Sequence, residues 1–72
     1  MEDQLRPGQV RDAIVGYLAE QREGATVVAI QQAVAARLGR EVPASSVRSF
    51  LRLHAGDMFE RTGRGHYRLR RQ

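Results

Sequence analysis

Apolar residues recur at helical spacing in the first third of the chain. They form a single stripe with the charged residues largely off it: Val10, Ile14, Tyr17 and Leu18. Pro7 suits the first position of a helix, because an N–H at that position would have no partner inside the helix. Gly24 suits the end of one, since glycine adopts the left-handed conformation that often ends helices. The pattern predicts a helix from Pro7 to Arg22.

The next segment begins with a short β-prone run, Ala25 to Val28, and continues as a second helical pattern. Its larger apolar residues are spaced by four: Ile30, Val34 and Leu38. Alanines fill the gaps between them, and alanine is the strongest helix former. We expect a small strand in the β-prone run, with Thr26 or its neighbour opening the next helix. That helix is predicted from Val28 to Leu38, before Gly39.

A third helix is predicted from Pro43 to Leu53. Four residues recur at spacings of three and four and define its inner side: Val47, Phe50, Leu51 and His54. Ser45 or Ser46 is placed to serve the first turn, where serine side chains often accept hydrogen bonds from backbone N–H groups. The residues Ala-Gly-Asp at 55–57 then break the pattern.

Two short alternating runs follow, joined by the glycine-rich residues 62–65. This arrangement is typical of a β-hairpin. Alternation along the strands turns three apolar side chains toward the helices: Phe59, Tyr67 and Leu69. It turns Arg68 and Arg70 away from them.

The predicted order is helix, short strand, helix, turn, helix and hairpin, which is a mainly α fold with a small β-hairpin. A chain of 72 residues has the size of one domain. We expect a flexible N-terminal arm over residues 1–6, a folded domain over residues 7–70, and a tail at residues 71–72. A domain this small buries a modest core, so a binding surface is expected rather than a deep catalytic pocket.

The sequence contains no cysteine, which excludes disulfides and cysteine-ligated zinc. Small secreted domains usually need such cross-links, so we expect a cytoplasmic protein associated with the nucleoid. No apolar run is long enough to span a bilayer, and we expect no membrane partner. The polar, acidic start at residues 1–4 is unlike a signal peptide.

Positive charge is concentrated in the C-terminal part of the chain. Residues 1–44 carry five arginines against six acidic residues, a charge of −1, and residues 45–72 carry seven arginines against two, a charge of +5. Every cationic side chain is arginine, which suits bidentate contacts to phosphate and to guanine. Such a distribution is typical of a protein that binds a polyanion.

Three segments carry a resemblance to a known family. They are Thr26–Val34, as a strand leading into a second helix, Ser45–Leu53, as a third helix, and Phe59–Leu69, as a hairpin closing on an aromatic-x-Leu pattern. In this order they resemble the winged helix-turn-helix family, over roughly residues 7–70. The hairpin is also similar to the wings of the HARE-HTH type in bacterial DNA-modification and transcription proteins.

The resemblance implies that the chain binds double-stranded DNA. In the family the third helix enters the major groove, and the wing contacts phosphates or the minor groove. On the third helix the implied DNA-binding residues are Ser45, Ser46, Arg48, Ser49 and Arg52. On the wing they are Arg61, Thr62, Arg64, His66, Arg68 and Arg70. One such domain covers little DNA, so we expect a homodimer, or fusion to a larger DNA-acting protein.

The residues themselves support some of these roles more than others. Arg48 and Arg52 are four apart on the outer side of the third helix, which carries no acidic residue. Arg64 lies between two glycines at the expected tip of the hairpin, where the backbone can approach a partner closely. Ser45, Ser46 and Ser49 either contact the DNA or only cap the third helix. Arg68, Arg70 and Arg71 either follow the DNA backbone or keep an edge strand soluble.

Other chemistry has little support in the sequence. His54 and His66 are single, without a neighbouring cysteine or pair of carboxylates, so we expect no metal site and no cofactor. No nucleotide-binding or hydrolase motif is present, and we expect no enzyme activity. The alternative function is a winged-helix protein-interaction module without DNA contact. It would bind through an apolar face, with Val15, Val27 or Met58 as its candidates.

Overall fold

A computed structural model describes residues 7–70 of the chain. Within them are three helices and three strands: α1 (Pro7–Ala19), β1 (Ala25–Thr26), α2 (Val27–Leu38), α3 (Ala44–Leu53), β2 (Phe59–Gly63) and β3 (His66–Leu69). The predicted N-terminal arm at residues 1–6 and the tail at residues 71–72, Arg71 included, lie outside the described residues.

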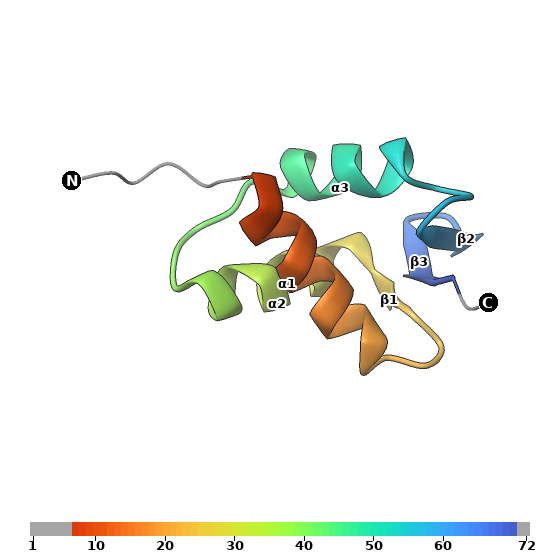
Figure 1. The fold of residues 1–72 in the computed structure, drawn as a ribbon, viewed down its shortest axis with the longest axis horizontal. Coiled ribbons are helices and arrows are strands. Elements are labelled where there is room, and N and C mark those ends of the chain that lie inside the picture. Colours follow the sequence, from red (N-terminus) through yellow and green to blue (C-terminus); the bar gives the residue numbers. More distant parts are fainter. Residues whose placement is uncertain (1–6, 71–72) are drawn as a thin grey trace.

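The strands form one antiparallel sheet in the order β1-β3-β2, at one end of the three helices (Figure 1). In this sheet Ala25 lies opposite Tyr67, and Phe59 lies opposite Leu69. The last strand in sequence is therefore the middle strand, and it connects the hairpin to the segment between α1 and α2. The fold is mainly α with a small sheet and is winged-helix-like, which confirms the predicted fold class.

The prediction that the first helix continues to Arg22 is wrong, because α1 ends at Ala19. After that residue the N–H groups of Glu20 and Gln21 donate to carbonyls only three residues back, and the N···O distance is 3.0 Å in each bond. Such bonds tighten the last turn of a helix and end it. The tight turns after Ala19 carry the chain to β1, where it pairs with β3.

The second helix begins one residue earlier than predicted, at Val27. Thr26 is its N-cap, with extended backbone, and its Oγ1 accepts a hydrogen bond of 3.1 Å from the N–H of Ala29. Val27 is buried, and Val28 is 59% exposed. The cap fixes the start of the helix, and Gly39 ends it in the left-handed conformation, as predicted.

The third helix begins at Ala44, with Pro43 as its N-cap. The side chains of Ser45 and Ser46 are exposed, and neither forms a hydrogen bond within residues 7–70. The interpretation of either serine as a cap of this helix is therefore wrong. Extended backbone at Pro43 starts the helix without help from a side chain, because the ring of proline fixes its φ angle.

One core holds the helices and the sheet together. Its buried apolar residues come from every element and from one loop: Ala13, Ile14, Leu18, Ala25, Val27, Ile30, Val34, Val42, Val47, Leu51, Phe59 and Tyr67. The loop residue is Val42, which the sequence pattern did not assign to the core, and its carbonyl accepts a hydrogen bond of 2.8 Å from Gln31. Among the described residues, no helix is long and apolar enough to cross a membrane.

Candidate functional site

We call the hairpin of β2 and β3 the wing. Its tip is irregular and is held by contacts within the hairpin. A bulge lies between Arg61 and Gly63, so that Gly63 faces His66 across the strands. The hydroxyl of Thr62, in the bulge, lies 2.5 Å from Nδ1 of His66. Gly65 has a φ of 63°, which glycine adopts without steric cost. This turn leaves Arg64 exposed at the tip.

The wing is attached to the second helix as well as to the sheet. The N–H of Val27, the first residue of α2, donates to the carbonyl of Gly65 over 2.9 Å. β1, directly before α2, pairs with β3 at Ala25 and Thr26. These bonds hold the tip of the wing in a defined position relative to the helices.

A cleft of about 460 Å³ separates the wing from the third helix. It is lined by residues of α2, α3 and the wing: Val27, Arg48, Arg52, Arg61, Arg64, Gly65 and Tyr67. We call this feature the arginine cleft. It brings together four of the predicted DNA-binding residues, two from the helix and two from the wing.

The arginine cleft is strongly cationic. Four of its seven lining residues are arginines and none is acidic. Within residues 7–70, Arg48, Arg52 and Arg64 form no ion pair or hydrogen bond through their side chains. Arg61 donates from Nε to the carbonyl of Gly63 over 3.2 Å, which leaves its charge uncompensated. Like charges gathered in this way repel one another, so an anion in the cleft would be bound favourably.

The remaining candidates on the third helix lie beside the cleft or away from it. Ser49 borders a second hollow together with Arg52 and Leu53, and Arg52 connects this hollow to the arginine cleft. Ser45 and Ser46 are exposed in the first turn of α3 and do not line the cleft. Leu53 is 77% exposed, and the sequence pattern did not assign it to the surface.

Two candidates on the wing lie on its other face. Arg68 donates from Nε to a carboxylate oxygen of Glu60 over 2.6 Å. Arg70 donates to the carbonyl oxygen of Gly56. Successive side chains of a strand point to opposite faces, and Tyr67 lines the cleft, so Arg68 points away from it. The structure therefore separates these two arginines from the four in the cleft.

Both histidines have partners inside the domain. The ring of His54 lies with its centroid 4.5 Å from that of Phe50, at the end of α3. His66 is half-buried, and its ring contacts the hydroxyl of Thr62. Neither His54 nor His66 lines the arginine cleft. In the part of the chain that the structure describes, no three histidine or carboxylate side chains gather in a way that could hold a metal ion.

Sequence reasoning missed three residues of the cleft wall, Val27, Gly65 and Tyr67. Val27 and Tyr67 are buried core residues that also border the cleft, and their pattern in the sequence indicates only the core. The signal for Gly65 was present, because the Gly-Arg-Gly tip predicts close approach of the backbone.

The apolar residues suggested for a protein interface are buried or partly buried. Val27 is 5% exposed, and Val15 and Met58 are partly buried against the core. The large apolar side chains exposed among residues 7–70 are Val28 and Leu53. The side chain of Val27 is therefore not accessible to a protein partner in this fold.

Comparison of the chain with protein-family models, with curated proteins and with solved structures finds no match.

Proposed function

We propose that this domain binds double-stranded DNA through the arginine cleft. The observation that carries the proposal is that Arg48 and Arg52 of α3 and Arg61 and Arg64 of the wing line one cleft that contains no carboxylate. Arginine binds phosphate oxygens and the edge of guanine in a bidentate manner. A helix and a hairpin that present arginines to one space suit the closely spaced phosphates of a duplex.

In the proposed complex the outer side of α3 enters the major groove. Ser45, Ser46 and Ser49 are exposed on this helix, and their small side chains permit a close approach to the bases. Arg64, at the tip of the wing, contacts phosphates or a narrow minor groove, where negative potential is enhanced. This docking mode is that of the winged helix-turn-helix family, and we propose that the chain is a member with a wing of the HARE-HTH type.

The proposal places the protein at the nucleoid in the cytoplasm. It acts there as a small regulator or as the DNA-recognition domain of a larger DNA-acting protein. A single domain of this size contacts few base pairs, so a dimer or a second DNA-binding element supplies the remaining affinity and specificity.

The test is fluorescence anisotropy with a labelled duplex of random sequence at several salt concentrations. We expect affinity to fall steeply with salt, and Arg48→Ala and Arg64→Ala each to weaken binding. Where the lost arginine contacts a phosphate, the slope of log K against log salt falls by about one. Arg40→Ala is the matched control, because Arg40 is exposed and lies outside the cleft.

Two results would contradict the proposal. One is a folded protein that does not bind a duplex even at low salt. The other is an equal loss of affinity in Arg40→Ala and in the cleft variants, since binding would then depend on net charge and not on the cleft.

A further inference from the structure

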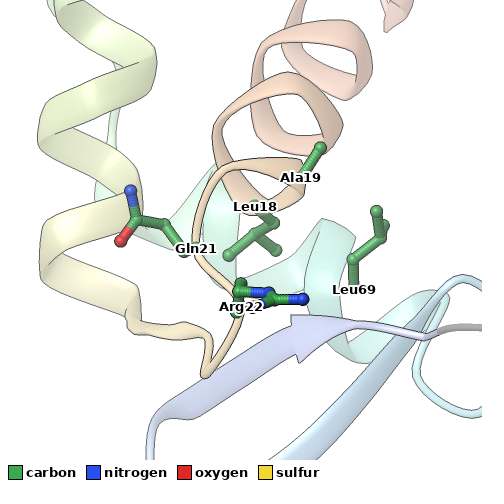
Figure 2. Close-up of a pocket in the computed structure, with 5 residues that line it drawn as sticks. All are labelled: Leu18, Ala19, Gln21, Arg22 and Leu69. Atoms are coloured by element: carbon green, nitrogen blue, oxygen red, sulfur yellow. The ribbon is translucent and has the colours of Figure 1, made fainter.

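Two hollows meet on the surface between the end of α1 and strand β3. The first, of about 260 Å³, is lined by Leu18, Ala19, Gln21, Arg22 and Leu69 (Figure 2). The second, of about 330 Å³, is lined by Arg22, Glu60, Arg68, Leu69 and Arg70. Arg22 and Leu69 line both hollows, and we call the two hollows together the α1–β3 groove.

The first part of the α1–β3 groove is apolar. Leu18 is 2% exposed, Leu69 is half-buried, and Ala19 lies exposed at the end of α1. Figure 2 shows Leu18 and Leu69 on two sides of the hollow, with the side chain of Arg22 extending below Leu18 toward Leu69. Leu18 forms the buried floor of the hollow, so an apolar side chain placed here would contact Ala19 and Leu69, with the guanidinium of Arg22 beside it.

The second part of the groove is cationic. It contains three arginines and one carboxylate, that of Glu60, which already accepts a hydrogen bond from Arg68. Arg70 donates to a backbone carbonyl, that of Gly56, so its charge remains. Among residues 7–70, Arg22 forms no ion pair or hydrogen bond through its side chain. A carboxylate at the junction of the two hollows would therefore find an unpaired guanidinium.

The groove and the arginine cleft share no lining residue. The cleft borders Tyr67, whereas the groove borders Arg68, Leu69 and Arg70, farther along the chain toward the end of β3. A ligand in the groove thus leaves the cleft open.

We propose that the α1–β3 groove binds an acidic segment of a partner protein, with one apolar side chain against Ala19 and Leu69 and a carboxylate on Arg22. Charge complementarity favours an anionic partner, since the groove carries three arginines against one carboxylate. The apolar hollow distinguishes an acidic peptide from nucleic acid, because a phosphate backbone has no apolar side chain to fill it. This inference does not rest on the proposed DNA binding.

The test uses a fluorescein-labelled peptide of seven residues, with one leucine at the centre of six aspartates and glutamates. A matched control peptide carries serine in place of the leucine. We expect the leucine peptide to bind about tenfold more tightly, because only its side chain is buried in the apolar hollow. We expect Arg22→Glu to weaken binding of the leucine peptide about tenfold, since attraction to the peptide carboxylates becomes repulsion.

Two further variants show where on the protein the peptide binds. Arg40→Glu makes the same change of charge at an exposed residue outside the groove and should leave peptide binding unchanged. Arg48→Ala tests whether the leucine is recognised in the arginine cleft instead, and should leave the preference for the leucine peptide over the serine peptide unchanged. Circular dichroism melting of every variant confirms that each remains folded.

Several outcomes would overturn the proposal. They are no binding of the leucine peptide, equal binding of the serine peptide, an Arg22→Glu variant that binds normally, or loss of the leucine preference in Arg48→Ala. Loss of duplex affinity in Arg22→Glu without loss of peptide affinity would assign the groove to nucleic acid and likewise overturn it. Failure of the wild-type protein to bind any duplex would contradict only the proposed function.

Discussion

A Cβ atom built on Gly24 would lie 2.3 Å from the carbonyl oxygen of Tyr67 and 2.7 Å from Cβ of Arg68. Gly24 also has a φ of 86°, in the region that favours glycine. The loop after α1 thus passes close to the backbone of β3, directly before β1 pairs with that strand. Only a residue without a side chain permits this approach, which connects the first helix to the wing.

We therefore expect Gly24→Ala to lower the free energy of unfolding by about 3 kcal/mol. The left-handed conformation costs about 1–2 kcal/mol, and relief of the overlap costs about 1–3 kcal/mol. Urea denaturation measures the change. Gly39→Ala is the control: its φ is 68°, but no atom lies within 4 Å of a built Cβ. That variant should lose only the conformational part, and equal losses in both would show that the overlap is relieved without cost.

The N-cap of α2 gives a second prediction. Thr26→Ala removes the hydroxyl that accepts a hydrogen bond from Ala29 and should destabilise the domain by about 1 kcal/mol. Thr26→Ser keeps the hydroxyl and should retain most of the stability. Thermal unfolding of the wild type and the two variants gives their order of stability. A serine variant as unstable as the alanine variant would assign the loss to the threonine methyl group instead.

Phe59 connects the wing to the third helix inside the core. Its side chain is fully buried, and its ring meets that of Phe50 in an edge arrangement with centroids 5.8 Å apart. Phe59→Ala should cost about 3–5 kcal/mol, as truncation of a buried phenylalanine does elsewhere. That is a large part of the stability of a domain this small, about 4–11 kcal/mol at usual values per residue. Phe59→Leu should lose less, and an unchanged unfolding midpoint in Phe59→Ala would contradict the packing described.

The two faces of β3 give a prediction about DNA affinity. Arg64 lines the arginine cleft, while Arg68 points to the other face and pairs with Glu60. On the proposed function, Arg64→Ala weakens duplex binding and lowers its salt slope by about one. Arg68→Ala removes the same charge and should leave the duplex affinity and its salt slope nearly unchanged. Anisotropy titrations of the two variants side by side make the comparison, and a reversed order of affinities would place the DNA on the outer face of the wing.

The predicted elements agree with the structure where local signals are strong. Gly39 ends α2 as predicted, because a left-handed glycine cap needs no information beyond the helix itself. The end of α1 was predicted three residues late, since the chain there must leave the helix to reach β1. Val27 and Val28 have similar propensities, so the burial of Val27 depends on how the start of α2 lies against the sheet and the core.

The sequence by itself determined three helices and a hairpin, the concentration of arginine in residues 45–72, and the alternation that separates Phe59 and Tyr67 from Arg68. Helical period, strand alternation and glycine positions are local, so they can be read without neighbours. Tertiary structure alone decided that Arg48 and Arg52 share a cleft with Arg61 and Arg64, and that Arg22 meets Leu69 in a separate groove. Those juxtapositions depend on how β1 pairs with β3 and how the core orients α3, which involve residues far apart in the chain.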